Sequence, residues 1–168
     1  MSRVFVGVGS NEGDRLALIS QAVKTLALVP QIQIVQMAVI TETEPVGGPP
    51  QGPYLNTVVE VETTLTPQVL LERLQEIERV FGRSASAERW SPRTMDLDLL
   101  SYEDRIVQDA QLTLPHPRLH ERRFVLEPLA QLAPDWVHPV LRKTVRELLA
   151  ALPPSAARSQ RPKWPDAD

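Results

Sequence analysis

The sequence predicts an α+β domain in which a mostly antiparallel sheet is flanked by helices. Several segments alternate β-branched and polar residues, which is typical of strands, and others place apolar residues three and four positions apart, which is typical of amphipathic helices. Two long helices cannot bury their apolar stripes against each other alone, so a sheet with helices packed on it is the simplest solution. A length of 168 residues fits one domain.

The first half of the chain has the pattern strand, helix, strand, strand. The expected segments are a strand over residues 3–9, a helix over 14–29, a strand over 32–41 and a strand over 55–64. Pro30 ends the helix, because proline lacks the backbone donor that a helix needs. A loop with four prolines and three glycines, residues 44–53, separates the last two strands.

A second long helix and a fourth strand follow. Thr66 is placed to cap this helix with Pro67 in its first turn, and Gly82 ends it. The strand covers residues 95–102, and a short reversal at Glu103 follows. Beyond it we expect an extended segment over 112–117, a mostly helical one over 119–132 and an amphipathic helix over 145–152. Residues 1–152 are thus expected to form the domain, and 153–168 a proline-rich, flexible tail.

The order of these elements, β-α-β followed by β-α-β, predicts a ferredoxin-like sandwich. An open, doubly wound sheet would need more strand–helix units than this sequence offers. The fold class expected from the sequence is therefore α+β, ferredoxin-like, with extra helices after the fourth strand.

Composition excludes several classes of function. The chain has no cysteine, which excludes a disulfide scaffold, a thiolate zinc site and a cysteine nucleophile, and fits a cytoplasmic protein. Its net charge of −3 argues against a nucleic-acid partner, although a local basic cleft is compatible with it. The sequence has no signal peptide and no run of 18 apolar residues, so no membrane partner is expected. We expect a monomer that acts on small molecules.

Two aspartates in the fourth strand are the strongest candidate site. Alternate residues of a strand face the same side, so Asp96 and Asp98 point together while Leu97 and Leu99 face the core. Neighbouring carboxylates repel unless a cation lies between them, and oxygen ligands of this kind suit Mg²⁺ bound to substrate phosphates. The alternative is an edge strand with two solvated aspartates.

Upstream of the aspartates, the sequence brings Arg83, Arg89 and Arg93 together with Trp90. Arginine binds phosphate oxygens through paired hydrogen bonds, and an indole offers a flat face to a ring. Arginines on a polar loop are otherwise simply solvated. Their position before a two-aspartate strand favours a metal–nucleotide site, because phosphoryl transfer depends on positioning and charge neutralisation.

Other polar residues are weaker candidates. The glycine-rich stretch over residues 7–13 matches neither the P-loop nor the dinucleotide pattern and is interpreted as a tight turn. His116 and His120 are four apart, but the prolines beside His116 argue against a helical zinc pair, so a phosphate contact next to Arg122 is the better interpretation. His138 is interpreted as structural.

An apolar slot with an amide is also indicated. Tyr54 and Asn56 begin the third strand, and Val46 and Phe124 lie at the ends of loops. Each of these residues alone is ordinary core or surface. Together with Trp90 they suit a flat heteroaromatic ring.

Several short motifs stand in order between residues 3 and 150. They are Gly9-Ser10-Asn11, Glu44-Pro45-Val46-Gly47, Tyr54-Leu55-Asn56, Ile77-Glu78, Gly82-Arg83, the run from Glu88 to Asp98, Leu114-Pro115-His116-Pro117 and Arg122-Arg123-Phe124. In this order they resemble the hydroxymethyl-dihydropterin pyrophosphokinase family of folate biosynthesis. The R-W-x-P-R-T-x-D-L-D run with a downstream P-H-P is the most specific part.

The resemblance implies a ferredoxin-like fold and transfer of the β,γ-pyrophosphoryl unit of ATP to the hydroxymethyl oxygen of the pterin, with release of AMP. It implies that Asp96 and Asp98 hold two Mg²⁺ ions, and that Arg83 and Arg93 are catalytic residues at the phosphates. Nucleotide contacts are implied for Gln75, Glu78 and Leu99 on the adenosine side and for Arg89, His116 and Arg122. A pterin pocket is implied for Thr43, Pro45, Val46, Tyr54, Asn56, Trp90 and Phe124, with the ring stacked between Trp90 and Phe124. Asp96 is the nearest proton acceptor for a general-base role.

Two alternatives stay open at this point. The first is another Mg²⁺-dependent nucleotidyltransferase, which would release pyrophosphate instead of AMP and would give Tyr54, Asn56 and Trp90 no special role. The second is a ferredoxin-like binding or regulatory module without catalysis, in which Asp96 and Asp98 are solvated and nothing depends on Mg²⁺.

One departure from the family pattern generates a prediction. Members often carry further basic residues after the position of Arg83, where this chain has Ser84, Ala85, Ser86 and Ala87. If this loop closes over ATP as a lid, its contribution to phosphate binding is weaker here. Replacing Ser86→Lys is expected to change turnover or the affinity for ATP in steady-state kinetics, and no effect on either quantity would contradict this role of the loop.

Overall fold

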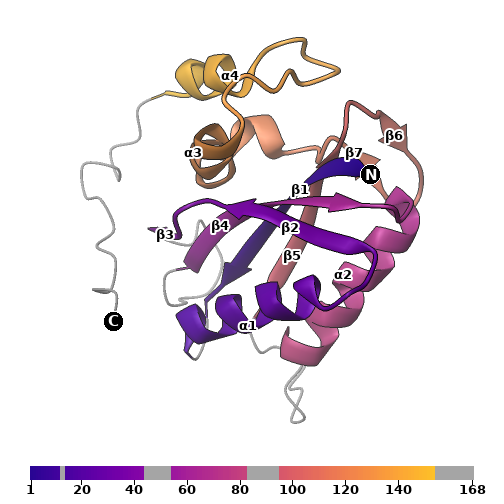
Figure 1. Cartoon of the computed structure of the whole chain (residues 1–168). Coiled ribbons are helices and arrows are strands. Elements are labelled where there is room, and N and C mark those ends of the chain that lie inside the picture. The colour runs from indigo at the N-terminus through magenta and orange to yellow at the C-terminus, as the bar shows by residue number, and fades with distance from the viewer. Residues whose placement is uncertain (12–13, 44–53, 83–94, 154–168) are drawn as a thin grey trace.

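The structure is a computed structural model that describes residues 1–11, 14–43, 54–82 and 95–153 (Figure 1). Its strands are β1 (Ser2–Ser10), β2 (Ile32–Met37), β3 (Thr41–Thr43), β4 (Tyr54–Thr63), β5 (Asp96–Tyr102), β6 (Val107–Gln108) and β7 (Thr113–Leu114). Its helices are α1 (Arg15–Ala27), α2 (Pro67–Gly82), the 3₁₀ turn η1 (Leu119–Glu121), α3 (Arg123–Leu132) and α4 (Val145–Ala151). The expected tail from residue 154 onward lies outside these ranges.

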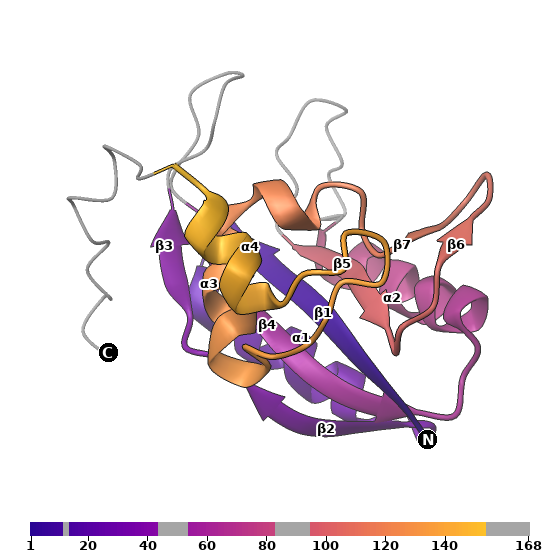
Figure 2. The ribbon, with the colours of Figure 1, turned by 90° about the horizontal axis from the view of Figure 1, so that it is seen from above.

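The main sheet has the strand order β2-β4-β1-β5, with β3 also paired to β4, and every pair in it is antiparallel. Helices α1 and α2 lie on one face of this sheet, and α3 and α4 on the other (Figures 1 and 2). The short β6–β7 hairpin stands apart as a second sheet. This arrangement confirms the predicted α+β, ferredoxin-like sandwich.

Each face of the sheet has its own apolar core, as the alternation along β1 predicts. Val4, Val6 and Val8 belong to the core beneath α1 and α2, whereas Phe5 belongs to the core beneath α3 and α4. All four side chains are buried. Because both faces of the sheet are covered at β1, the residues of β1 that point to either face are apolar, except at the glycines.

Side-chain caps begin both long helices, at Thr66 as the sequence predicts and at Asp14 in addition. Thr66 Oγ1 accepts the backbone N–H of Val69 at 3.2 Å at the start of α2, and Asp14 Oδ1 accepts that of Ala17 at 3.2 Å at the start of α1. Helix α1 ends at Ala27, two residues before the predicted end.

The predicted single strand over residues 32–41 is wrong, because the segment is divided into β2 and β3. Thr57 Oγ1 donates to the carbonyl of Ala38 at 2.8 Å, and the backbone N–H of Val39 donates to Gln131 Oε1 of α3 at 2.9 Å. These side chains take backbone groups that a continuous ladder would use, so the chain leaves regular pairing before it returns in β3.

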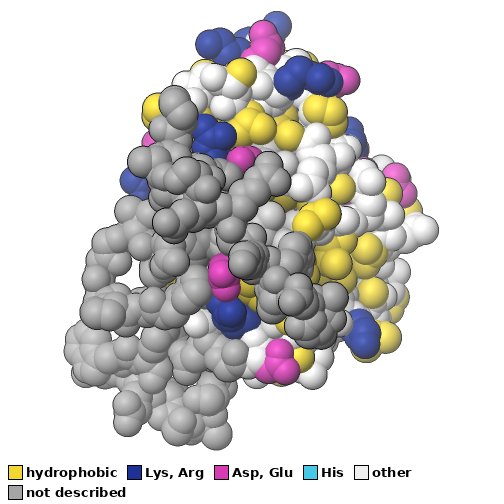
Figure 3. All heavy atoms as spheres, turned by 90° about the vertical axis from the view of Figure 1, so that its left-hand side faces the viewer, with side chains coloured by type: hydrophobic (Ala, Val, Ile, Leu, Met, Phe, Trp, Pro, Cys, Tyr) yellow, Lys and Arg dark blue, Asp and Glu magenta, His cyan; other side chains and the backbone are white. Residues whose placement is uncertain are grey.

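The outer edge formed by β2 and β3 exposes apolar side chains. Val35, Met37 and Val39 are 46%, 44% and 54% exposed. Figure 3, which faces the β3 side of the molecule, shows hydrophobic side chains gathered beside the residues drawn in grey. None of the described helices is long and apolar enough to cross a membrane.

A bulge divides β5 into two parts. Val6 pairs with Leu99 while Phe5 pairs with Ser101, so Leu100 is the extra residue. On the N-terminal side of the bulge, Leu97 and Leu99 are buried in the core under α1 and α2. Asp96 and Asp98 therefore face the other side of the sheet, as predicted from the two-residue period.

His138 has a structural role, in agreement with its interpretation from the sequence. Its side chain is buried, and Nδ1 accepts the backbone N–H groups of Val140 and Leu141 at 3.2 and 3.1 Å. Burial lowers the pKa of His138, and His120, whose ring centroid lies 6.2 Å away, lowers it further. Protonation of Nδ1 would remove the acceptor that holds this turn.

This environment predicts a loss of stability in acid. Since the pKa of His138 is lower in the folded than in the unfolded chain, the unfolded state binds more protons, and the free energy of unfolding falls as the pH drops below the unfolded value of about 6.5. The variant His138→Asn keeps an acceptor that does not titrate. Urea unfolding at several pH values between about 7.5 and 5.5 should show a smaller decrease for the variant, and equal decreases would contradict this role.

Candidate active site

Four directly paired residues form a row across the sheet on the face that carries α3. Gly9 of β1 pairs with Asp96 of β5 on one side and with Asn56 of β4 on the other. Asn56 in turn pairs with Thr41 of β3. Directly paired residues point to the same face, so an acidic side chain and an amide lie on either side of a position without a side chain.

Gly9 leaves the space that the Asn56 side chain occupies. A Cβ atom at position 9 would lie 2.8 Å from Asn56 Oδ1, closer than real Cβ contacts allow. At Gly7, which pairs with Asp98 on the same face, a Cβ would meet Leu100 at an ordinary 3.6 Å. Asn56 is only 8% exposed, so its amide is held over β1 within a largely buried setting.

The acidic pair lies next to Tyr54 on one side and next to His116, with its neighbouring arginines, on the other. Burial raises the pKa of the Tyr54 hydroxyl, and the negative charge of Asp96 raises it further. Asp98 interacts electrostatically with His116, and so do Arg122 and Arg118. The structure thus brings together six of the sequence-predicted site residues: Tyr54, Asn56, Asp96, Asp98, His116 and Arg122.

His116 is held in one tautomer by its own loop. Its Nδ1 accepts the backbone N–H of Arg118 at 3.1 Å, so the proton of the neutral ring is on Nε2. Burial lowers the pKa of His116; Arg122 and Arg118 lower it as well, while Asp98 opposes them. The ring is therefore a neutral donor through Nε2.

Arg122 and Phe124 lie at the start of α3. The guanidinium carbon of Arg122 is 5.4 Å from the centroid of the Phe124 ring, a cation–π distance that orients both side chains. Phe124 is half-buried and packs against the core beneath α3 and α4. Its position in the first turn of a helix differs from the loop end expected from the sequence.

The three residues expected on the adenosine side have different surroundings. Glu78 Oε2 accepts the backbone N–H of Leu97 at 2.7 Å, and Gln75 is exposed on the same helix. Leu99 is only 4% exposed and packs in the core. With its side chain in the core, Leu99 would reach a nucleotide through its backbone, and its place on the adenosine side stays a prediction.

The remaining predicted site residues lie outside the described part of the chain. These are Pro45, Val46, Arg83, Arg89, Trp90 and Arg93, together with the lid residue Ser86. Thr43 ends β3 opposite Tyr54, and the structure describes its backbone but not its side chain.

Three features of the site were missed from the sequence. They are the steric role of Gly9, the hydrogen bond of Glu78 to β5, and Arg118 beside His116. Glycines at alternate positions of a strand signal close approach on one face, so Gly7 and Gly9 offered a clue. The hydrogen bond at the edge of β5 had no local signal, because it depends on the order of the strands.

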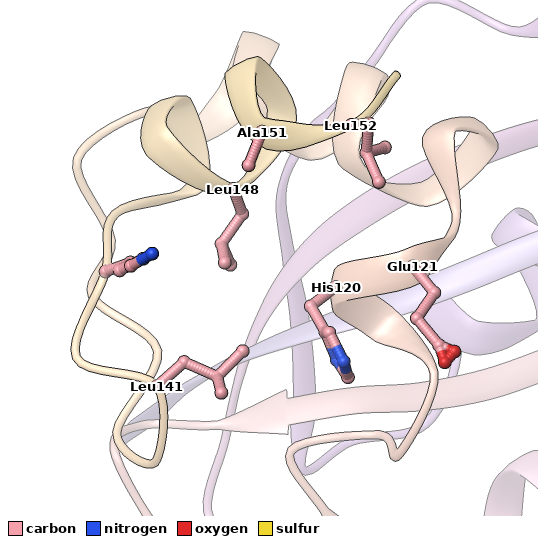
Figure 4. Close-up of a pocket in the computed structure, with 7 residues that line it drawn as sticks. His120, Glu121, Leu141, Leu148, Ala151 and Leu152 are labelled. Atoms are coloured by element: carbon pink, nitrogen blue, oxygen red, sulfur yellow. The ribbon is translucent and has the colours of Figure 1, made fainter. Parts of the chain in front are cut away.

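His120, the second histidine of the spacing considered for zinc, lies among residues away from the row on the sheet. No three His, Asp or Glu side chains gather as a possible metal site within the described ranges. His120 packs edge-on against His138, and it lines a pocket of about 380 Å³ between η1 and α4 (Figure 4). Leu141, Leu148, Ala151 and Leu152 also line this pocket, which is a different place from the row on the sheet.

Curated relatives resemble the chain over most of its length. A protein of Methylorubrum extorquens named 2-amino-4-hydroxy-6-hydroxymethyldihydropteridine pyrophosphokinase is 45% identical over 155 residues, which cover 92% of this chain and 96% of that one. Its namesake in Synechocystis is 44% identical over 144 residues, covering 86% and 73%, and that of Bacillus subtilis is 43% identical over 128 residues, covering 76% of each.

Solved structures agree on the fold. The wild-type HPPK-DHPS of Plasmodium falciparum with pteroate superposes with a TM-score of 0.70 at 15% identity over 89% of this chain. The present chain spans only 42% of that longer one, so the likeness concerns the fold alone.

The model of one protein family matches residues 5–134, which include every described residue of the row and of the His116 and Arg122 cluster. Its description is 7,8-dihydro-6-hydroxymethylpterin-pyrophosphokinase (HPPK). The chain belongs to this family, the pyrophosphokinases of folate biosynthesis.

Proposed function

We propose that this protein transfers the β,γ-pyrophosphoryl unit of ATP to the hydroxymethyl oxygen of 6-hydroxymethyl-7,8-dihydropterin and releases AMP. The observation that carries the proposal is the row Asp96–Gly9–Asn56, which sets an acidic pair one strand away from a buried amide. Phosphates and a heteroaromatic ring would thus meet on one face of the sheet. We also propose a cytoplasmic monomer that acts on these two small molecules.

Asp96 and Asp98 are the residues that would hold Mg²⁺, and two ions are expected. The donor set fits, because both groups are carboxylates on the same face, and hard oxygen ligands suit Mg²⁺ that also binds phosphates. When bound, Mg²⁺ neutralises charge on the phosphate oxygens and orients them. The repulsion between the two carboxylates is a further reason for a cation here.

Positive charge and a neutral donor would contact the phosphates from the other side. Arg122 lies beside His116, whose Nε2–H is free of the contact that fixes Nδ1. We assign to these two groups the binding of phosphate oxygens, together with Arg83, Arg89 and Arg93 from the loop before β5. Alignment and charge neutralisation then account for the chemistry, since phosphoryl transfer needs little else from the protein.

The amide of Asn56 would recognise the edge of the pterin. A buried amide that hydrogen-bonds its substrate rejects analogues that leave it unpaired. Tyr54 stays protonated at neutral pH, because its pKa is raised, and so acts as a hydrogen-bond donor. Phe124 and Trp90 are proposed to stack on the ring, with Thr43, Pro45 and Val46 completing the pocket.

The hydroxymethyl oxygen must lose a proton during the transfer. Asp96 is the carboxylate closest to the amide side of the row and is the proposed acceptor. Gln75, Glu78 and the backbone of Leu99 are proposed for the adenosine side.

The first experiment tests the reaction and the acidic pair together. With ATP, Mg²⁺ and the pterin, the protein is expected to form AMP only when the pterin is present. Asp96→Ala should reduce turnover by about 10³-fold or more, because a metal contributes several kcal/mol at such a transition state. Asp104→Ala, at an exposed aspartate after β5, is the matched control and should turn over normally.

Each other result has a defined meaning. If the Asp96→Ala protein stayed active, the assignment of Asp96 as a metal ligand would be wrong. Release of pyrophosphate from ATP would point to a nucleotidyltransferase, and absence of any product from wild-type protein would point to a binding module without catalysis.

A second experiment tests the recognition of the pterin. In Gly9→Ala, the new methyl group would collide with Asn56 Oδ1, so the KM for the pterin should rise by about 10-fold, the equivalent of one displaced hydrogen bond. The KM for ATP should change much less. Gly7→Ala, where the new Cβ makes only an ordinary contact, should leave the pterin KM within about 2-fold. Equal effects of the two substitutions would refute the assignment of Asn56.

A further inference from the structure

The strand that carries the acidic pair has a free edge, and a side chain from α2 closes it. Among the described strands, β5 pairs with β1 on one side and with no strand of the main sheet on the other. We propose that Glu78 is a positioning residue that sets the affinity for the metal ions by fixing β5 at Leu97, between Asp96 and Asp98. The inference rests on the proposed use of that pair to hold Mg²⁺.

The free edge of β5 is held at two points that flank Asp98. The backbone N–H of Leu97 donates to Glu78 Oε2 at 2.7 Å. The carbonyl of Leu100, the bulge residue, accepts the backbone N–H of His116 at 2.8 Å. Without such partners, edge residues exchange their hydrogen bonds with water and the strand end is less ordered.

Glu78 reaches the edge of β5 from α2, the helix that covers the face opposite the aspartates. Leu97 packs in the core under α1 and α2, the helix that carries Glu78. With its side chain and its N–H both fixed, Leu97 leaves little freedom to the residues on either side. A carboxylate acceptor makes this bond stronger than a neutral acceptor would, because the hydrogen bond is charge-assisted.

Toward the metal ions we assign Glu78 an indirect role, separate from its proposed place on the adenosine side. It does not join Asp96 and Asp98 in a group of three metal-ligating side chains, a type of group that is absent from the described ranges. Residues that hold metal ligands in place are known to matter: their loss typically costs about 10- to 100-fold in metal affinity or activity.

The test measures metal binding without turnover. Binding of Mn²⁺ to the full-length protein is measured by electron paramagnetic resonance, with a non-hydrolysable ATP analogue at a concentration that saturates each variant, so that a change in nucleotide affinity does not enter. Glu78→Ala is expected to weaken Mn²⁺ by about 10- to 100-fold, and Glu78→Met, which keeps the aliphatic stem, should do the same. Glu78→Gln retains an acceptor for the Leu97 N–H and should stay within about 3-fold. Glu72→Ala, at an exposed glutamate of the same helix, is the matched control and should bind normally.

Amide hydrogen exchange at Leu97 provides a second readout that involves no metal. Exchange should be faster in Glu78→Met and close to wild type in Glu78→Gln. Unchanged Mn²⁺ affinity in Glu78→Met would overturn the inference, and so would a loss in Glu78→Gln as large as in Glu78→Met, because the charge itself would then be needed. If wild-type protein bound Mn²⁺ no better than Asp98→Asn, the proposed metal site would fail and the inference with it, whatever the exchange data showed.

Discussion

The pairing of β1 with β4 on one side and β5 on the other is the constraint on which the site depends. It sets Gly9 between Asp96 and Asn56, and Gly7 next to Asp98. A slip of one residue in either pairing would turn the acidic pair or the amide into the opposite core. Leu97 and Leu99 of β5 and Val59 and Val61 of β4 oppose that slip, because it would remove them from the core that they share with the valines of β1. Core packing and site geometry are therefore fixed by the same register.

Negatively and positively charged side chains lie close together in the site. The carboxylates of Asp96 and Asp98 face a protonated tyrosine on one side and a neutral histidine with arginines on the other. Neither Tyr54 nor His116 carries a charge at neutral pH, so among the described neighbours of the pair it is Arg122 and Arg118 that bring positive charge near His116. The proposed binding of a divalent cation and of phosphates rests on this separation of charge.

Local patterns predicted the parts of the structure that depend on neighbours in sequence. The period of two placed Asp96 and Asp98 on one face, and the Thr66 cap and the structural role of His138 are confirmed. The break between β2 and β3 was not predictable, since the N–H of Val39 bonds to Gln131, which lies 92 positions away. The hydrogen bond of Glu78 to Leu97 was not predictable for the same reason. Leu99 was expected on the adenosine side from the family resemblance; its side chain packs in the core, and its role stays a prediction. The roles of the residues in the loops before β4 and β5 stay predictions.

The bulge at Leu100 separates what holds the aspartates in register from what holds the edge of β5. Leu99 pairs with Val6 and Ser101 with Phe5, so removing Leu100 would restore regular pairing on both sides of the gap. The acidic half of β5 would keep its phase relative to β1. Such a deletion would remove the carbonyl that accepts the backbone N–H of His116, and with it the Leu100 side chain from the core beneath α3 and α4. The extra residue of β5 therefore serves the opposite core and the segment that docks on the strand's edge, and the register of the aspartates does not depend on it.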